Sequence, residues 1–206
     1  MRVIGGSARG RPLRAPRAGA VRPTSDRVRE AMFDVLTHLG ALWEKRVLDG
    51  FGGSGALGIE ALSRGASSVT FVEADRRVAT ALEANLVSTG FAGAPGVRIV
   101  RGDLLAHLAT DQMRYDLALL DPPYAFEDWA RLLGLVNAEV VVVESDREIE
   151  LPAKFQIHRC YRYGTTLVTV ARASTPHGVE GSAGRRRAGS GGPLPEPASE
   201  ARKERA

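Results

Sequence analysis

The chain has 206 residues, of which 44% are hydrophobic and 25% charged, with a single cysteine and a formal net charge of +4. This composition predicts an ordinary globular chain with one core of good size, and it excludes an internal disulfide. No apolar run approaches the roughly 20 residues of a membrane span, and the arginine-rich start lacks the apolar stretch of a signal peptide, so we expect a cytoplasmic protein with no membrane contact.

The charge is distributed unevenly along the chain. Residues 1–30 hold eight arginines against Asp26 and Glu30, whereas residues 31–171 carry 13 basic and 18 acidic groups. An acidic body with a basic leading segment predicts a core that handles a small molecule and an arm that meets a polyanion, although arginines kept for solubility would give the same counts. We expect a basic arm or hairpin over 1–22, a main domain over 23–172 and a disordered low-complexity tail over 173–206.

The first predicted elements are a hairpin and a helix. Gly5 and Gly6, followed by spaced arginines, favour a small hairpin with a basic face. After a turn near residues 22–24, apolar residues recur at helical spacing from Val28 to Leu39. The opposite face of this helix is expected to carry Arg27, Arg29 and Glu30.

A strand over residues 45–49 then runs into a glycine-rich turn. Residues 53–58 read Gly-Ser-Gly-Ala-Leu-Gly, the G-x-G-x-x-G pattern of a strand-to-helix junction, and the helix over 56–64 presents free N–H groups to a ligand there. A second strand, 68–72, ends at Glu73, 20 positions after Gly53, where a carboxylate can accept both hydroxyls of a ribose. The combination predicts a nucleoside-containing cofactor; a glycine loop that only packs is the alternative.

The strand and helix pattern then repeats. A helix over 75–89 and a strand over 97–100 lead to Asp103, which either contacts a cofactor base or only caps the short helix 104–108. A strand from residue 115, a helix over 127–136, a strand over 139–143 and a hairpin from 154–162 and 165–171 follow. This order predicts an α/β Rossmann-like fold whose seven-stranded, mostly parallel sheet is closed by an antiparallel C-terminal hairpin.

The fourth strand ends at Asp121-Pro122-Pro123-Tyr124. Two prolines cannot continue a ladder, so the chain must turn at the carboxyl end of a buried strand, where open α/β sheets bind ligands. Asp121 and a proline-flanked carbonyl can accept the two N–H bonds of a planar amino group while Tyr124 stacks on its face. Taken alone, the tetrapeptide is equally well explained as a plain turn.

Other chemistry finds little support in the sequence. His38, His107, His158 and His177 show no ligand spacing, so we expect no metal. Cys160 lies in the terminal hairpin without the Pro-Cys context of a covalent cytosine methyltransferase, which predicts an inert strand cysteine.

Together these motifs resemble the class I S-adenosyl-L-methionine-dependent methyltransferases, specifically the bacterial enzymes that methylate guanine N2 in 16S ribosomal RNA. The resemblance covers about residues 1–171 and is carried by VRPTSDRVREAMFDVL, VLDGFGGSGALGIEALSRGA, FVEAD, DPPY and YGTTL. DPPY alone would equally suit N6-adenine, N4-cytosine or glutamine-N5 methylation. The family usually has D-L-F-A-G-S-G, whereas residues 49–55 of this chain read D-G-F-G-G-S-G. The two additional glycines, Gly50 and Gly52, are expected to loosen the loop and to affect cofactor affinity.

The resemblance implies a role for each motif. S-adenosylmethionine would be held by the 49–55 loop, by Glu73 at its ribose and by Asp103 at its adenine; the loop residues concerned are Asp49, Phe51, Gly53, Ser54 and Gly55. The catalytic slot would consist of Asp121, Pro122, Pro123 and Tyr124. Phosphate contacts are expected from Arg9, Arg11, Arg22 and Arg27. The implied partner is 16S ribosomal RNA in an assembling small subunit, bound by a monomer without metal.

Two other classes stay open at this stage. A nicotinamide-dependent oxidoreductase would use the same glycine loop, but it gives no reason for DPPY. A non-catalytic RNA-binding or ribosome-assembly factor would keep the basic segment and tolerate loss of Asp121.

Overall fold

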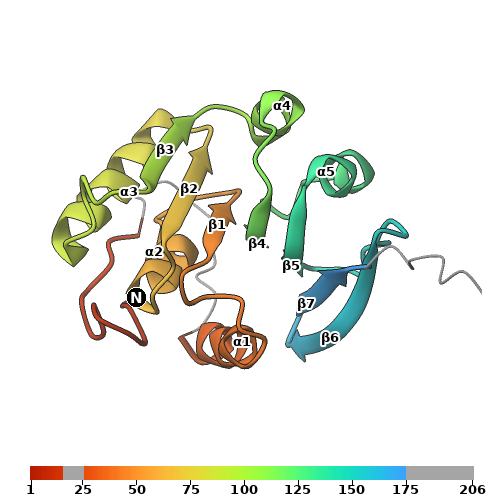
Figure 1. Cartoon of the computed structure of the whole chain (residues 1–206), viewed down its shortest axis with the longest axis horizontal. Coiled ribbons are helices and arrows are strands. Elements are labelled where there is room, and N and C mark those ends of the chain that lie inside the picture. Colours follow the sequence, from red (N-terminus) through yellow and green to blue (C-terminus); the bar gives the residue numbers. More distant parts are fainter. Residues whose placement is uncertain (16–25, 175–206) are drawn as a thin grey trace, which may run out of the picture. The chain divides into compact units, whose positions relative to one another are not determined.

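A computed structural model describes residues 1–15 and 26–174, and Figure 1 shows its elements. Helices and strands follow in the expected order, with ends within a few residues of the predicted ones. The elements are α1 (Asp26–His38), β1 (Arg46–Asp49), α2 (Ala56–Ser63), β2 (Ser68–Glu73), α3 (Arg76–Thr89), β3 (Val97–Arg101), α4 (Leu104–Thr110), β4 (Tyr115–Leu120), α5 (Trp129–Leu135), β5 (Ala138–Ser145), β6 (Phe155–Tyr163) and β7 (Thr166–Ala173). Arg22 and residues 175–206 of the expected tail lie outside the described residues, whereas Ala173, where the tail was expected to begin, is the last residue of β7.

The strands form one seven-stranded sheet in the order β3-β2-β1-β4-β5-β7-β6. Strands β1 to β5 pair in parallel, and β7 pairs antiparallel with both β5 and β6. The predicted Rossmann-like fold with an antiparallel C-terminal hairpin is therefore confirmed. The strand order reverses between β1 and β4, and such a switch point is where open α/β sheets bind ligands.

Alternating side chains of the sheet bury two separate apolar layers. One cluster joins Val47, Phe71 and Leu119 of the strands to α1, α2 and α3. The other joins Leu48, Ala118 and their neighbours to α4 and α5. Because both faces are covered, the central strands β4 and β5 read as nearly continuous apolar runs.

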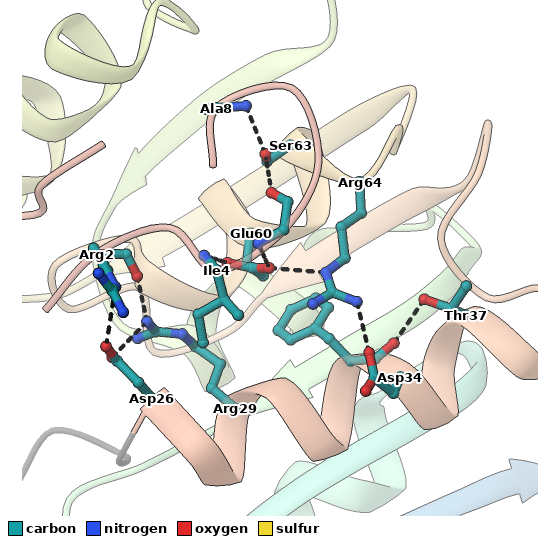
Figure 2. A network of polar contacts seen from close by, with 12 residues as sticks. Arg2, Ile4, Ala8, Asp26, Arg29, Asp34, Thr37, Glu60, Ser63 and Arg64 are labelled. Carbon is teal, nitrogen blue, oxygen red and sulfur yellow. Dashed lines mark hydrogen bonds and ion pairs between the residues drawn. The ribbon is translucent and has the colours of Figure 1, made fainter. Parts of the chain in front are cut away.

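The N-terminal segment forms a small hairpin-like turn that packs on α2. Arg2 and Pro12 form an antiparallel bridge, and the N–H of Val3 donates to the carbonyl of Arg11 at 3.0 Å. Figure 2 shows how Glu60 and Ser63 of α2 receive this segment. The N–H groups of Ile4 and Gly5 donate to the Glu60 carboxylate at 2.7 and 2.8 Å. The expected hairpin is thus present, and it is tied to the main sheet through α2.

Arg29 was expected on the face of α1 opposite the apolar stripe, and the sequence pattern did not indicate that it is buried. Its side chain is only 1% exposed, and its Nη2 donates to Asp26 at 3.0 Å and to the carbonyl of Arg2. Burial lowers the pKa of Arg29, and the nearby charges of Asp26 and Glu60 oppose that shift. The N-terminal segment covers this second face of α1, a long-range contact that helical periodicity cannot indicate (Figure 2).

Candidate active site

The glycine loop (residues 49–55) and the proline loop (residues 121–124) leave the same edge of the sheet. They follow β1 and β4, which are parallel neighbours with Asp49 opposite Leu119. The N–H of Gly50 continues this pairing by donating to the carbonyl of Leu119 at 2.9 Å. Both loops therefore start side by side at the carboxyl ends of their strands, at the switch point of the sheet.

An aromatic contact joins the glycine loop to the residues just after the proline loop. The rings of Phe51, in the glycine loop, and Phe126, just after the proline loop, have centroids 5.5 Å apart in an edge-to-face arrangement. Phe126 also meets Trp129 of α5, at 5.2 Å. A turn holds Phe126, since its N–H donates to the carbonyl of Pro123 at 2.8 Å. Sequence reasoning missed Phe126; its only signal was an aromatic residue two positions after Tyr124.

Backbone conformation and close packing explain why glycine is present at several positions in and after the first loop. Gly53 and Gly55 have φ angles of 53° and 80°, which side chains rarely adopt. A Cβ on Gly55 would lie 2.2 Å from a methyl of Leu82, and one on Gly58 would lie 2.2 Å from the ring of Phe71. Close packing of α2 on β2 and α3 therefore requires glycine at both positions.

Asp49 is hydrogen-bonded to the first turn of α2. Its carboxylate is 1% exposed and accepts a hydrogen bond of 2.8 Å from the N–H of Gly58. Burial raises the pKa of Asp49 to about 7; the Gly58 N–H works against this shift, and the charge of Glu73 adds to it. Because burial destabilises the charged form of Asp49, a ligand that brings positive charge to the loop would be favoured there.

Glu73 ties the end of β2 to the glycine loop. One carboxylate oxygen accepts from the N–H of Gly53 and the other from the N–H of Asp75, each at 2.8 Å. A carboxylate oxygen has two acceptor positions, so each oxygen keeps one for a further donor such as a ribose hydroxyl. Contact with a ribose itself stays a prediction.

Asp103 caps α4, as the simpler of its two expected roles requires. Its carboxylate accepts from the N–H of Ala106 at 2.8 Å, and the residue is exposed. The second oxygen of this carboxylate has no hydrogen bond within the described part of the chain. A contact of Asp103 with a cofactor base stays a prediction.

The proline loop presents a partly buried carboxyl beside an open ring. Burial raises the pKa of Asp121 well above its usual value, and the charges of Glu144 and Asp49 raise it further. Pro122 is buried, whereas the side chain of Tyr124 is 44% exposed. Glu144, at the carboxyl end of β5, was not anticipated as part of this edge. Its signal was the position of an acid at the end of a buried apolar run.

The arginines expected to contact RNA lie elsewhere in the fold. Arg9 is exposed in the hairpin turn, which contacts Ser63 at the end of α2 away from the glycine loop. Arg11 donates to the carbonyl of Ser88 at 3.0 Å, near the end of α3. Arg27 is exposed on α1, and Arg22 lies outside the described residues. The structure brings none of the described three to the proline loop, and their contact with RNA stays a prediction.

A cavity of about 500 Å³ lies beside the hairpin. Its lining includes Arg9, Trp43 and Arg64 and no residue of the 49–55 or 121–124 segments. Across residues 1–15 and 26–174, no group of three or more His, Cys, Asp and Glu side chains is arranged to hold a metal ion. None of the helices described there has the length and apolar character needed to cross a membrane.

Comparison with known proteins relates these motifs to a family. The family model described as "Conserved hypothetical protein 95" matches residues 1–172. The chain belongs to this family. The "Ribosomal RNA small subunit methyltransferase D" of Escherichia coli (strain K12) is 37% identical over 169 residues, covering 77% of this chain and 83% of that relative. The protein of the same name from Haemophilus influenzae is 40% identical over 168 residues, covering 76% of this chain and 86% of its own length.

A solved structure supports the same relationship. The Escherichia coli protein yhhF matches with a TM-score of 0.74 and 34% identity, covering 84% of this chain and 97% of yhhF. The methyltransferase family expected from the sequence motifs is confirmed. The names of the relatives specify the ribosomal RNA of the small subunit and leave the methylated atom open.

Gly52 invites a test, because the pattern given by the resemblance has alanine at its position. A Cβ on Gly52 would make only ordinary contacts, 3.5 Å from Leu82 and from the carbonyl of Val72. Gly52→Ala is therefore expected to stabilise the fold by about 0.4–1 kcal/mol, by reducing the freedom of the unfolded chain. Urea unfolding measures this, and Gly55→Ala, which forces a 2.2 Å contact, is expected to destabilise. A destabilised Gly52→Ala would contradict the prediction.

The raised pKa of Asp49 predicts a dependence of stability on pH. Between its usual pKa of 3.8 and the folded value of about 7, the folded protein binds a proton that the unfolded chain does not. The free energy of unfolding therefore falls as pH rises through this window. Asp49→Asn removes that penalty, so it is expected to stabilise the protein at pH 8 by roughly 2–4 kcal/mol and to have little such effect near pH 4.

Urea unfolding of both proteins at several pH values provides this measurement. Asp146→Asn, at an exposed position after β5, is the matched control and should change stability by less than about 0.5 kcal/mol at every pH. A difference between Asp49→Asn and the parent protein that does not grow with pH would contradict the expectation.

Proposed function

We propose that this chain transfers a methyl group from S-adenosylmethionine to the exocyclic N2 amino group of a guanine in 16S ribosomal RNA. One observation carries the proposal: the glycine loop and the proline loop start side by side at the switch point of the sheet, and Phe51 of the first contacts Phe126, two residues after the second. A methyl donor held by the first loop would face an amino group held by the second. The names of the relatives support ribosomal RNA as the substrate.

The cofactor would be held by groups that the fold already orients. The N–H groups at the start of α2 and the acid Asp49 suit the charged amino-acid part, and Glu73 suits the ribose hydroxyls. Asp103 is the candidate for the adenine. When bound, S-adenosylmethionine supplies a methyl group on a positively charged sulfur, which is already an activated electrophile. The protein needs neither a metal nor a covalent nucleophile, only position and charge.

The proline loop would hold the amino group of the base. The lone pair of guanine N2 is delocalised into the ring, which makes N2 a poor nucleophile. Hydrogen bonds from this NH2 to Asp121 and to the carbonyl of Pro122 would turn the lone pair toward the methyl group and stabilise positive charge developing on nitrogen. Tyr124, with its ring 44% exposed, would stack on a base that has been drawn out of its helix.

Asp121 also suits the proton that the reaction releases. When N2 gains a methyl group through its lone pair, the bond from carbon to sulfur breaks and its electron pair stays on sulfur. The substituted nitrogen must then lose one of its protons. A carboxylate whose pKa is raised well above the usual value is a better acceptor for that proton than an ordinary surface carboxylate.

The RNA would extend well beyond the catalytic slot. Exposed Arg9 and Arg27 are candidates for phosphate contacts, with Arg22. Arg11 already donates to the carbonyl of Ser88, so only its remaining N–H groups could meet a phosphate. Because the hairpin turn meets the far end of α2, a substrate that touches both sites must span at least the length of this helix. A folded segment within an assembling small subunit meets this requirement.

The test is direct methylation. The purified protein is incubated with S-adenosylmethionine and with small ribosomal subunits, or bare 16S ribosomal RNA, from cells that lack it. Nucleosides are then analysed by mass spectrometry, and we expect new N2-methylguanosine at one position. New N6-methyladenosine, N4-methylcytosine or a methylated protein would contradict the assigned substrate. Binding of RNA without any methyl transfer would favour an assembly factor.

A further inference from the structure

Asn85 joins the cofactor loop to the N-terminal segment inside the protein. This residue of α3 is 0% exposed. Its amide nitrogen donates to the carbonyl of Ser54 at 2.8 Å and to the carbonyl of Arg14 at 3.0 Å. Its amide oxygen accepts from the N–H of Arg14 at 2.9 Å. One side chain therefore holds two segments that are 31 and 71 residues away in the sequence.

The amide of Asn85 matches the hydrogen-bonding groups around it. Asparagine is a poor residue for a helix interior, and burying its amide costs free energy unless its hydrogen bonds are made. Both donors and one acceptor position of Asn85 are used. The orientation of the amide follows from its partners, because turning it over would place its oxygen against two carbonyl oxygens.

At Arg14 and at Ser54, Asn85 supplies hydrogen bonds that backbone pairing leaves open. The pairing of the hairpin ends where the N–H of Leu13 donates to the carbonyl of Met1, so Arg14 lies just beyond it. Within the described residues, the backbone groups of Arg14 have no hydrogen bond other than those with Asn85. The same holds for the carbonyl of Ser54, which lies between the two left-handed glycines of the cofactor loop. The side chain of Arg14 is exposed, so the residue that contacts Asn85 also presents a positive charge to solvent.

We propose that Asn85 is a positioning residue that makes cofactor binding and RNA binding depend on each other. A cofactor that fixes the loop around Ser54 also fixes the amide of Asn85, and the amide fixes Arg14 and the basic segment that it follows. RNA that binds this segment stabilises the loop in return, because coupling between two sites is reciprocal. The inference rests on the proposed function, since it assigns the N-terminal segment to RNA.

A neighbouring residue provides a matched control. Thr89 lies one turn after Asn85 on α3 and is also buried, at 4% exposure. Among the described residues, its hydroxyl donates only to carbonyls of its own helix, those of Asn85 and Leu86. Thr89→Val therefore removes a buried hydrogen bond from the same helix face without touching either segment.

The experiment measures the affinity for S-adenosylhomocysteine, which cannot react, by calorimetry. It is done with and without saturating RNA, supplied as 16S ribosomal RNA transcribed in vitro and as small subunits from cells lacking the protein. For the parent protein we expect RNA to tighten binding about fivefold or more, the lower end of typical coupling. Asn85→Leu should bring this factor close to one, and Thr89→Val should keep it.

A second pair of variants leaves α3 unchanged in case Asn85→Leu does not fold. Arg14→Pro removes the N–H that donates to the amide oxygen of Asn85, so this variant should also abolish coupling. Arg14→Gln keeps this backbone N–H, so it should retain the coupling while weakening RNA binding. Coupling that persists in both Asn85→Leu and Arg14→Pro, or that is absent from the parent protein, would overturn the inference. A parent protein that binds S-adenosylhomocysteine but no RNA would instead remove the proposed function on which the inference rests.

Discussion

Replacing Asp121 with asparagine is expected to lower kcat for methyl transfer by about 10- to 100-fold while the affinities for cofactor and RNA stay within a few-fold of the parent values. A hydrogen bond to a charged group contributes roughly 1.5–3 kcal/mol, which corresponds to one or two decades when it acts only in the transition state. Asparagine keeps the shape of the side chain but loses its charge and its ability to take a proton. Single-turnover methylation with saturating cofactor measures the chemical step.

The pH dependence gives this prediction a second readout. Because the pKa of Asp121 is raised, the parent rate should increase with pH as the carboxyl ionises, and the variant should lose that part of the profile. Asp116→Asn is the control: Asp121 directly follows β4, whereas Asp116 lies near the start of that strand and pairs with Arg46. Full activity of Asp121→Asn, or equal losses in both variants, would contradict the assigned role.

The sheet and the two loops could be predicted because they depend on local patterns. Apolar runs that end in Gly-Ser-Gly, in Glu73 or in Asp-Pro-Pro-Tyr mark strand ends, and the βαβ rule then orders the strands. The acid at the end of β2 was expected near the glycine loop, and it accepts a hydrogen bond from Gly53. These features need only short stretches of sequence and general rules of α/β folds.

What the sequence did not reveal are contacts between distant segments. Arg29 reads as an exposed helical residue until the N-terminal hairpin is placed over it. Asn85 reads as one polar residue on an apolar helix face, although it bridges Ser54 and Arg14. Neither the periodicity of a helix nor a motif encodes which other segment will lie above a given side chain. These polar residues were therefore missed because their partners lie 27 to 71 residues away.

Helix α2 connects the two kinds of site at its two ends. Its first turn, after Gly55, borders the cofactor loop, and Glu60 and Ser63 near its last turn hold the hairpin (Figure 2). With eight residues, it is about 12 Å long at 1.5 Å per residue. This distance separates the hairpin turn from the cofactor loop. Beyond the hairpin, Arg14 lies near the cofactor loop again, because Asn85 bonds both Arg14 and Ser54. A change at the far end of α2 should therefore affect the hairpin before it affects the cofactor loop.

The sharpest such change is Glu60→Gln, which is expected to destabilise the protein by about 3–5 kcal/mol, the usual cost of breaking a buried ion pair by removing one partner. Glu60 is 0% exposed and accepts hydrogen bonds from the N–H groups of Ile4 and Gly5 and from the Nε of Arg64. Glutamine would turn an NH2 group toward these donors. It would also leave the buried guanidinium of Arg29 with less compensating charge.

Urea unfolding of Glu60→Gln beside Glu83→Gln separates this effect from a general loss of negative charge. Glu83 pairs with Arg101 at the surface, where both side chains are about half exposed, and such a pair contributes only about 0–1 kcal/mol. A Glu60→Gln protein as stable as Glu83→Gln would show that the hairpin does not depend on the buried carboxylate. If the expected loss is found, RNA affinity should fall with it, while S-adenosylhomocysteine binding to the folded protein should change less, because the cofactor loop lies at the other end of α2.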